Sequence, residues 1–453
     1  MFLNEKCGIF GIYGNQSDAS RLVYYGLWAL QHRGQENSGI ASSTGRKIYC
    51  HKGQGLVAQA YRESDFKTLR GNIAIGHNRY STFGKSQIDH AQPVYTQQNT
   101  MASAHNGNLP IVSKLKRFLK NAGLPTDGLN DSEMMYKAIE YWLIKGKNIE
   151  DAIKLSFPLF HGAFSLLVMT KKELVAVRDA NGIRPLCMGR VNGSYVFASE
   201  TCALDTIGAE FVRDVAPGEM VVVDKDGPRF VQIQKGKERL DIFEYIYFAR
   251  PDSYLQGKSI YQIRKNLGIA LARKVKISAD MIIPVPDSGI PAAIGFSQES
   301  GIKLEEVLVK NRYIHRTFIQ PSQRQRSSGV KMKLNLIKEV VKGKRVILID
   351  DSIVRGTTSK LLAEILRSAG PKEIHMVITS PPVKFPDFYG INTPKKKDLV
   401  AANMSIEQLR KYIGVDSLTF LTLKETIDAI GVPKNKLCTS CFDGEYPVKV
   451  PVF

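Results

Sequence analysis

The chain has 453 residues, of which 43% are hydrophobic and 23% charged, and its formal net charge at pH 7 is +20. This length exceeds one ordinary hydrophobic core, and the mixture of residues is too apolar for a disordered chain, so two or three globular domains are expected. The Lys and Arg residues are spread along the chain without a zinc-finger, RNP or helix-turn-helix pattern, which favours polyanionic small substrates over nucleic acid as partners.

The first half of the chain alternates short apolar stretches with glycine and polar turns, a pattern typical of many short strands. The stretches are CGIFGIYG, GIASST, IAIGHNRYST, AFSLLVM, ELVAVRD, YVFASE and MVVVD. Helices are expected near residues 20–31, 111–121 and 131–145. A polar and basic stretch, QKGKERL, follows at 234–240, and we expect a domain boundary there that separates residues 7–235 from residues 236–453.

The second half of the chain has a different rhythm. Its elements are expected to be a strand MIIPVP, a helix at 291–299, a strand EEVLVK, a long basic segment, a strand RVILIDD, a helix at 357–369 and a strand IHMVITS. Strands that alternate with helices indicate βαβ units and a parallel sheet. VILI at 346–349 is apolar throughout, as a strand covered on both faces should be, and such runs are far shorter than the roughly 18 residues of a membrane span.

The N-terminus contains a cysteine in an unusual position. MFLNEKCGIFGIYG carries Glu5 and Lys6 ahead of its apolar residues and lacks the basic region of a secretory signal, so a cytoplasmic protein is expected. Cys7 is followed by an apolar strand, where a cysteine is commonly a small buried residue. If residues 1–6 were removed as a propeptide, Cys7 would carry a free α-amino group, whose pKa of about 7.7–8.0 makes it a usable base. One residue would then supply both nucleophile and base.

Attack on a carboxamide needs donors for the oxyanion, a carboxylate for the substrate ammonium group and a cation for its carboxylate. Candidates stand in QHRGQ at 31–35, GHNRYST at 76–82, HNGN at 105–108 and DSE at 131–133. Each is a weak signal alone, because HNG is commonly a turn and a surface arginine is commonly solvated. Together and in this order they resemble the glutaminase domain of the class II amidotransferases, which are N-terminal nucleophile hydrolases.

This resemblance covers residues 7 to about 230 and implies an αββα domain. It also implies that the segment before Cys7 is removed and that Cys7 attacks the amide of glutamine. The residues implied at the site are Asn106 (side chain) and Gly107 (backbone N–H) in the oxyanion hole, Arg79 at the glutamine carboxylate, Asp131 at its amino group, and Arg33 lining the pocket.

The motif VILIDDSIVRGTTSK, at 346–360, indicates a phosphate site. A buried strand ends in Asp350 and Asp351, and a loop rich in small hydroxylated residues then opens a helix. The N–H groups of residues 353–358 and the hydroxyls of Thr357 and Thr358 can surround a phosphate at the positive end of that helix. The aspartates can accept the hydroxyls of a vicinal diol, directly or through hydrated Mg²⁺, so the motif predicts a ribose 5-phosphate site. A structural turn after an edge strand is the alternative.

The same motif resembles the 13-residue signature of the type I phosphoribosyltransferases. The resemblance implies phosphoribosyl ligands at Asp350, Asp351, Ser352, Ile353, Val354, Arg355, Gly356, Thr357 and Thr358. VPDSG at 285–289 follows the strand MIIPVP and corresponds to the pyrophosphate loop of that family. It implies Asp287 and Ser288 at the pyrophosphate, and a Mg²⁺ site formed by Ser288, Asp350 and Asp351.

A basic segment, KNRYIHRTFIQPSQRQRSSGVK, contains Lys310, Arg312, Arg316, Arg324 and Arg326. It is either a solvated loop or a flexible lid that orders over pyrophosphate and excludes water. We favour the lid, with Lys310 and Arg312 at the pyrophosphate, because a loop of about 20 residues inside a compact domain is seldom idle.

A glutaminase followed by a phosphoribosyl site resembles, over nearly the whole chain, the enzymes that open purine synthesis. The stretches that carry the match include QHRGQENSGIA, FEYIYFARPDS, KNRYIHRTFIQP, SPPVKFPDFYGIN and LCTSCFDGEYP. The implied reaction converts glutamine, phosphoribosyl pyrophosphate and water to 5-phospho-β-ribosylamine, pyrophosphate and glutamate, with ammonia passing through an internal channel. Also implied are a homo-oligomer, commonly a tetramer, and inhibition by purine nucleotides; no nucleic-acid or membrane partner is expected.

One branch of these enzymes holds a [4Fe–4S] cluster on four cysteines, and this chain departs from that pattern. Cys438 and Cys441 remain, whereas Asp241 and Asp387 stand at the other two positions. Carboxylates are poor ligands for a soft iron site, so we expect no cluster, and the two cysteines are interpreted as remnants or a reducible pair.

Two alternative functions differ from this reading. A class II amidotransferase that acts on a hexose phosphate would carry sugar-isomerase domains in place of DDSIVRGTT. A catalytically silent sensor of phosphoribosyl pyrophosphate would need neither a nucleophile at Cys7 nor a glutamine pocket.

Overall fold

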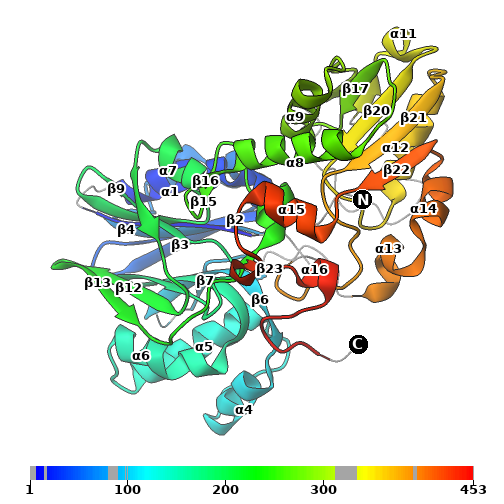
Figure 1. Ribbon diagram of the computed structural model, residues 1–453. Coiled ribbons are helices and arrows are strands. Elements are labelled where there is room, and N and C mark those ends of the chain that lie inside the picture. The colour runs from blue at the N-terminus through cyan, green and yellow to red at the C-terminus, as the bar shows by residue number, and fades with distance from the viewer. Residues whose placement is uncertain are drawn as a thin grey trace.

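The computed structural model describes residues 7–14, 18–79, 90–96, 98, 100–311, 334–390 and 395–451. Two antiparallel sheets build the N-terminal half, drawn blue to green in Figure 1, and a parallel sheet lies in the C-terminal half. Within the described ranges, no helix combines the length and the hydropathy that a membrane crossing requires.

The first sheet has seven strands in the order β11-β9-β10-β1-β4-β2-β3. Their bounds are Gly8–Tyr13 (β1), Asn37–Ser43 (β2), Ile48–Gln54 (β3), Ile73–Arg79 (β4), Cys187–Val191 (β9), Ser194–Ala198 (β10) and Glu210–Asp214 (β11). The second sheet has six strands in the order β13-β12-β8-β7-β6-β5. Their bounds are Val94–Tyr95 (β5), Met101–Ile111 (β6), His161–Thr170 (β7), Leu174–Arg178 (β8), Glu219–Asp224 (β12) and Gly227–Gln232 (β13).

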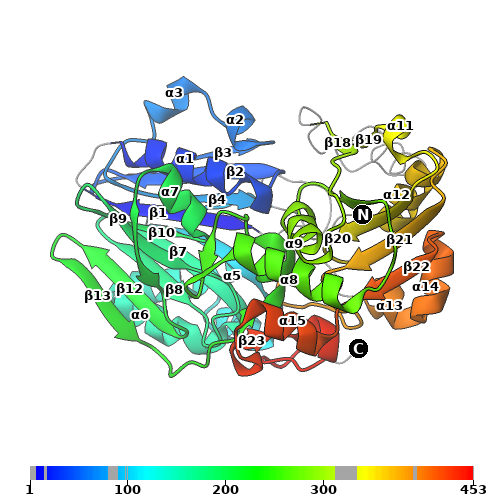
Figure 2. The ribbon, with the colours of Figure 1, turned by 45° about the horizontal axis from the view of Figure 1, so that its top comes forward.

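The two sheets pack face to face, and helices cover both outer faces (Figure 2). Ile9, Ile75 and Leu167 belong to the core between the sheets. One outer layer comprises Ala19–Ala29 (α1), Val57–Ala60 (α2), Glu63–Phe66 (α3) and Thr201–Thr206 (α7); the other comprises Ser113–Asn121 (α4), Asp131–Ile144 (α5) and Ile149–Ser156 (α6). This arrangement is the predicted αββα fold, and the helices predicted near 20–31, 111–121 and 131–145 are α1, α4 and α5.

The C-terminal sheet has four parallel strands in the order β17-β20-β21-β22. They are Met281–Pro284 (β17), Arg345–Asp350 (β20), Glu373–Ile378 (β21) and Ser417–Phe420 (β22). Ile347 and Ile349 face one core, while Val346 and Leu348 face another, so helices bury both faces. The covering helices are Ile260–Lys274 (α8), Ile290–Ser300 (α9), Lys338–Val341 (α11), Thr357–Arg367 (α12), Val400–Asn403 (α13), Ile406–Ile413 (α14) and Leu423–Ile430 (α15). The predicted parallel sheet is confirmed.

The strand predicted at EEVLVK lies outside the parallel sheet. Leu308–Lys310 (β18) pairs antiparallel with Leu334–Leu336 (β19) in a separate two-stranded ribbon. Val309 is 50% exposed, so this segment lacks the cover on both faces that keeps a strand inside a parallel sheet. Short pairings complete the chain: Leu240–Asp241 (β14) with Leu437–Cys438 (β23), and Tyr254–Leu255 (β15) with Lys258–Ser259 (β16). A last short helix, Ser440–Asp443 (α16), follows β23.

A buried cluster of charges joins the two halves. Arg33 Nε lies 2.5 Å from Glu200 Oε1, and Arg33 Nη2 lies 2.5 Å from Glu244 Oε2. Arg184 pairs with Glu244 and, at 3.1 Å, with Asp241. Glu244 comes from a short π-helix, Glu244–Phe248, at the start of the C-terminal half, whereas the two arginines belong to the N-terminal half. Arg33 and Glu200 pair within the N-terminal half, whereas Glu244 and Asp241 meet their arginines only when the halves are docked.

Glu200 extends this cluster toward the start of the C-terminal half. His32 Nε2 lies 2.6 Å from its carboxylate, and the backbone N–H of Arg250 and the hydroxyl of Ser253 donate to it at 2.8 and 2.7 Å. Burial alone would raise the pKa of Glu200, but His32 and Arg33 outweigh burial and hold this pKa well below its usual value.

We expect Glu244→Gln to destabilise the protein strongly. The substitution leaves Arg33 and Arg184 buried beside a neutral amide, and breaking a buried ion pair costs roughly 3–5 kcal/mol. Thermal unfolding should show a midpoint many degrees below that of the unmodified chain. Asp428→Asn is the matched control, because it removes an exposed pair with Lys424 and should shift the midpoint little. Equal midpoints for the two variants would contradict this role of the cluster.

Candidate active sites in the two halves

Cys7 lies directly before β1, in the centre of the seven-stranded sheet. Its neighbour Gly8 is opposite Asn78 of β4, so the next pair along is Cys7 and Arg79. Asn78 and Gly8 face helix α1, where Asn78 Nδ2 donates to Leu27 O at 2.6 Å. Because neighbouring residues of a strand alternate between faces, Cys7 and Arg79 share the opposite face, toward the second sheet.

The predicted oxyanion-hole residues lie on β6, in that second sheet. Asn106 is fully buried, and its Nδ2 lies 3.5 Å from the hydroxyl of Ser199. That hydroxyl also accepts the N–H of Ile9 at 3.0 Å, so Ser199 connects Asn106 to the strand that follows Cys7. Gly107 has a φ of +147°, and a Cβ there would lie 2.0 Å from Ala163 O, so only glycine fits. Sequence reasoning missed Ser199, which stands in no motif.

Asp131 begins helix α5 beside these residues. Its Oδ2 accepts the N–H of Leu109 at 3.1 Å and lies 3.9 Å from His105 Nδ1. Asn130 caps the helix by accepting the N–H of Glu133 at 2.9 Å, which fixes the position of Asp131. Burial lowers the pKa of His105, so the ring is neutral at pH 7. Cys7 and Arg79 thus lie at adjoining ends of β1 and β4, while Asn106 and Gly107 lie within β6 of the facing sheet and Asp131 begins α5 beside β6.

Arg33, predicted to line the glutamine pocket, is engaged in the charge cluster that joins the halves. Its guanidinium is only 1% exposed and points to Glu200 and Glu244 in the charge cluster. Gly8 is close by, since a Cβ there would lie 3.4 Å from Arg33 Cδ. Arg33 therefore lies next to the nucleophile strand, but its charge is engaged at the junction of the halves. Sequence gives no sign of this, because Glu200 and Glu244 are 167 and 211 residues away.

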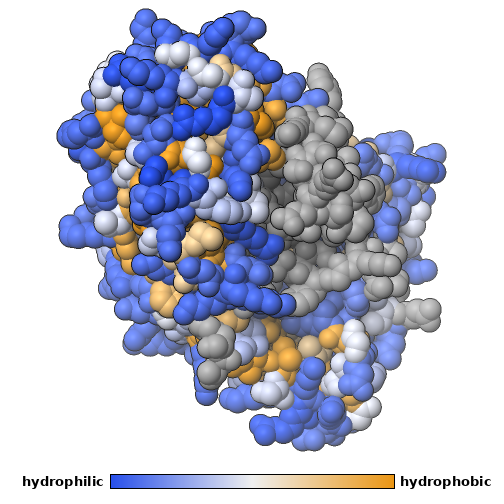
Figure 3. Space-filling view, turned by 90° about the vertical axis from the view of Figure 1, so that its right-hand side faces the viewer, coloured by the Kyte–Doolittle hydropathy of each residue, from blue (hydrophilic) through white to orange (hydrophobic). Residues whose placement is uncertain are grey.

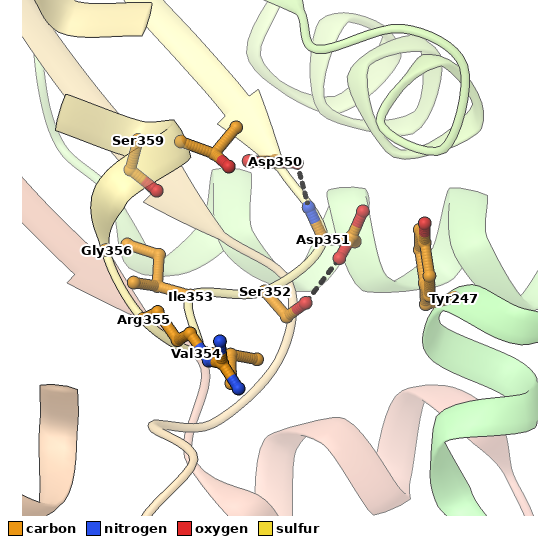
Figure 4. Close-up of a pocket in the computed structure, with 10 residues that line it drawn as sticks. Tyr247, Asp350, Asp351, Ser352, Ile353, Val354, Arg355, Gly356 and Ser359 are labelled. Carbon is orange, nitrogen blue, oxygen red and sulfur yellow. Dashed lines mark hydrogen bonds between the residues drawn. The ribbon is translucent and has the colours of Figure 1, made fainter. Parts of the chain in front are cut away.

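In the C-terminal half, Asp350 and Asp351 stand at the carboxyl end of β20 (Figure 4). Each is 7% exposed. Asp351 N donates to Asp350 Oδ1 at 2.9 Å, and Ser352 Oγ donates to Asp351 Oδ1 at 2.5 Å. The two carboxylates and the loop that follows line one pocket, formed by Tyr247, Asp350, Asp351, Ser352, Ile353, Val354, Arg355, Gly356, Thr358 and Ser359.

Helix α12 begins directly after this loop. Gly356 has a φ of +72°, a conformation that glycine adopts without strain, and Thr357 starts the helix. The N–H groups of the first turn therefore face the pocket at the positive end of the helix dipole, where an anion is favoured. The predicted loop residues are brought together; Tyr247, which the sequence reasoning did not single out, faces them from the π-helix (Figure 4).

The second predicted loop meets the first through Ser288. The Ser288 hydroxyl donates to Asp351 Oδ2 at 2.5 Å. The two residues can meet because strands β17 and β20, which precede them, are adjacent and parallel. Asp287 pairs with Lys310, and both side chains are exposed, at 70% and 44%. The remaining basic residues of the predicted lid, Arg312, Arg316, Arg324 and Arg326, lie outside the described residues.

The site fits a hard divalent cation. The hydroxyl of Ser288 contacts the carboxylate of Asp351, and Asp350 lines the same pocket as Asp351; Mg²⁺ is commonly held by one or two carboxylates together with substrate phosphates. Burial and the charge of Asp351 raise the pKa of Asp350 well above its usual value, and burial raises that of Asp351. A cation would relieve the repulsion between these carboxylates.

The four positions that hold the [4Fe–4S] cluster in one branch of the family, here Asp241, Asp387, Cys438 and Cys441, also lie close together. Asp241 is opposite Cys438 in the strand pair of β14 and β23. The Oδ2 atom of Asp241 accepts a hydrogen bond from Arg184 Nη1 at 3.1 Å. Burial, with the charges of Asp241 and Asp387, raises the pKa of the Cys438 thiol to about 12. Among the described residues, no three or more His, Cys, Asp and Glu side chains form an arrangement suited to a metal ion. An arginine-paired carboxylate and a protonated thiol do not suit iron–sulfur ligation.

Comparisons with known proteins agree with both halves. Residues 77–206 match the glutamine amidotransferase domain family, and residues 252–381 match the phosphoribosyl transferase domain family. A Synechococcus elongatus amidophosphoribosyltransferase is 46% identical over 99% of this chain and 92% of that protein. A Bacillus subtilis amidophosphoribosyltransferase is 43% identical over 99% of this chain and 95% of that protein.

A solved structure gives the same result. Glutamine phosphoribosylpyrophosphate amidotransferase from B. subtilis, complexed with ADP and GMP, is 42% identical and superposes with a TM-score of 0.91, covering 98% of each chain. A second structure, described as the allosteric regulatory enzyme of purine biosynthesis, has a TM-score of 0.92 and 42% identity, covering 98% of this chain and 97% of the other.

The raised pKa of Asp350 predicts a stability that depends on pH. The ionised carboxylate is disfavoured in the folded chain, so the folded state is destabilised at pH values above the raised pKa, and this cost shrinks as the pH falls from the raised value to the ordinary carboxyl pKa. Asp350→Asn removes the charge and should raise the thermal midpoint at pH 8, and raise it less at pH 5.

Asp416→Asn is the opposite control. Arg367 and the N–H of Ile374 lower the pKa of Asp416 although burial opposes them, so its loss should lower the midpoint at pH 8. A midpoint of Asp350→Asn at or below that of the unmodified chain at pH 8 would refute charge burial at Asp350.

Proposed function

The chain belongs to the amidophosphoribosyltransferase family, and from this premise we propose how its residues divide the reaction between two sites. The family joins a glutamine amidotransferase to a phosphoribosyltransferase, a pentosyltransferase of class EC 2.4.2.14. Its reaction is the first step of de novo purine synthesis: glutamine, phosphoribosyl pyrophosphate and water give 5-phospho-β-ribosylamine, pyrophosphate and glutamate. The function predicted from the sequence is confirmed, and a silent sensor is not favoured.

We assign the release of ammonia to the N-terminal half, residues 7–235. Once residues 1–6 are removed, the α-amino group of Cys7 takes the thiol proton, and the thiolate attacks the carboxamide of glutamine. The side chain of Asn106 and the N–H of Gly107 stabilise the oxyanion. Arg79 holds the glutamine carboxylate and Asp131 its ammonium group. The support for this assignment is the convergence of these side chains on one end of the two facing sheets.

We assign the transfer to the C-terminal half, residues 236–453. The N–H groups and hydroxyls of residues 352–358 hold the 5-phosphate, while Asp350 and Asp351 accept the ribose hydroxyls. Ser288, Asp287 and Lys310 bind the pyrophosphate, and Arg312 belongs to the same set. Mg²⁺, held by Asp350, Asp351 and Ser288, would neutralise charge on the departing pyrophosphate. The pocket at the end of β20 is the observation that supports this assignment.

Ammonia must then reach the second site without being protonated. The halves adjoin at the π-helix, where Glu244 meets Arg33 and Arg184, and Tyr247, three residues later, lines the phosphoribosyl pocket. We place the internal channel along this junction, which connects β1 and β6 with β20.

Regulation, assembly and location are further parts of the proposal. The B. subtilis structure contains ADP and GMP. We propose that purine nucleotides inhibit this enzyme by occupying its phosphoribosyl pocket, that the chain assembles as a homotetramer, and that it works in the cytoplasm.

Cys7→Ser tests the division of labour. The variant should lose glutamine-dependent synthesis by several orders of magnitude and retain most synthesis from added ammonia, because the phosphoribosyl pocket is unchanged. Assays with glutamine and with ammonium at alkaline pH measure the two separately. Glutaminase activity that survives in Cys7→Ser would remove Cys7 from its role, and parallel loss with ammonia would show a damaged fold.

Intact mass and iron content test the N-terminus and the absence of a cluster. We expect active enzyme to begin at Cys7, since the α-amino group of that residue is the proposed base. We also expect it to contain no iron, because Asp241 is paired with Arg184 and the Cys438 thiol is protonated at pH 7. Active enzyme that retains residues 1–6 would rule out the α-amino base. Iron at four atoms per chain in anaerobically purified protein would overturn the interpretation of Asp241 and Asp387.

A further inference from the structure

Asn37 is a buried amide for which the proposed mechanism has no use. It is the first residue of β2 and is 2% exposed. Neither its Nδ2 nor its Oδ1 has a hydrogen-bond partner among the residues that the structure describes. A buried amide without partners is costly and rare, so its persistence points to a partner that is a ligand.

The strand register places Asn37 in the glutamine site. Asn37 is opposite Arg79 of β4, and Arg79 is in turn opposite Cys7, which directly precedes β1, so the three form one row over adjacent strands. Residues opposite each other in an antiparallel pair point to the same face. Ser38, the next residue, points the other way and donates to Asn78 Oδ1 at 2.9 Å. Asn37 therefore faces the second sheet, as Cys7 and Arg79 do.

The face of β2 that carries Asn37 also packs near the predicted oxyanion hole. Gly39, two residues further on that face, lies so close to the second sheet that a Cβ would be 2.2 Å from Gln92 O. Gln92 in turn accepts the N–H of His105 at 2.7 Å, next to Asn106. Arg79 Nη1 is also buried without a partner among the described residues. Asn37 Nδ2 and Arg79 Nη1 are thus two unused donors on neighbouring strands.

The length of the row suits glutamine. Three adjacent strands place the first and last Cα roughly 10 Å apart. When the carboxamide of glutamine meets Cys7 at one end, its extended side chain carries the α-carboxylate toward Arg79 and Asn37. We propose that Asn37 is a further glutamine ligand, whose Nδ2 donates a hydrogen bond to the α-carboxylate beside Arg79. This proposal rests on the proposed glutaminase site and adds a specificity residue to it.

Steady-state kinetics of Asn37→Ala test the contact. We expect the KM for glutamine to rise roughly 10-fold, the size of a hydrogen bond to a charged group, with kcat little changed. The KM for phosphoribosyl pyrophosphate and the synthesis from ammonia should stay unchanged. Asn37→Asp, which keeps the shape but sets a carboxylate against the substrate carboxylate, should raise the KM further. Ser38→Ala is the matched control on the opposite face and should leave the KM for glutamine unaltered.

A substrate analogue separates direct contact from a structural effect. Glutaminamide carries a neutral amide in place of the α-carboxylate, so the preference for glutamine over glutaminamide in kcat/KM should shrink in Asn37→Ala. Without glutamine, the thermal midpoint of Asn37→Ala should equal or exceed that of the unmodified enzyme, because an unsatisfied amide is removed. An unchanged KM, or an equal loss for both substrates, would overturn the role of Asn37. Failure of the unmodified enzyme to use glutamine would instead overturn the glutaminase assignment itself.

Discussion

The buried carboxylates of Glu200 and Glu244 hold the molecule in one arrangement. Their ion partners come from residues far apart in the chain, and charges removed from water must be compensated at short range. The cluster thus brings Arg33, beside the nucleophile strand, against the π-helix whose Tyr247 lines the phosphoribosyl pocket. The spatial relation between the two sites follows from this pairing.

Both sites contain polar groups whose burial is unfavourable until a ligand binds. Asp350 and Asp351 repel one another in a pocket that a cation and a phosphorylated sugar can fill. Asn37, Arg79 and Asn106 each keep at least one buried atom without a partner in the described part of the chain. Such groups lower stability in the empty enzyme and contribute to affinity when the substrate satisfies them.

The surface has a different character from these sites. Hydrophilic residues dominate the face seen in Figure 3, with hydrophobic residues in smaller groups between them. Many ion pairs of the described residues are exposed and contribute little to stability, as with Lys424 and Asp428. The net charge of +20 is consistent with polyanionic substrates and a Lys-rich surface, and the enzyme family agrees with that interpretation.

The sequence by itself determined the fold class, the reaction and the motifs, because these depend on local order. A continuous apolar strand followed by two aspartates and a loop of small residues specifies β20 and helix α12 with few neighbours involved. HNGN, which alone is commonly a turn, instead lies inside strand β6 and is paired with β7. Only the tertiary structure decided which residues share a face or a charge. Ser199, Tyr247 and Asn37 lie in quoted stretches of the sequence, but nothing local in those stretches assigns them a role. Strand register places Asn37, a long-range hydrogen bond places Ser199, and the position of the π-helix places Tyr247. Arg33 shows the limit most clearly: its motif predicts a pocket residue, and only the tertiary structure reveals that carboxylates more than 160 residues away engage its charge.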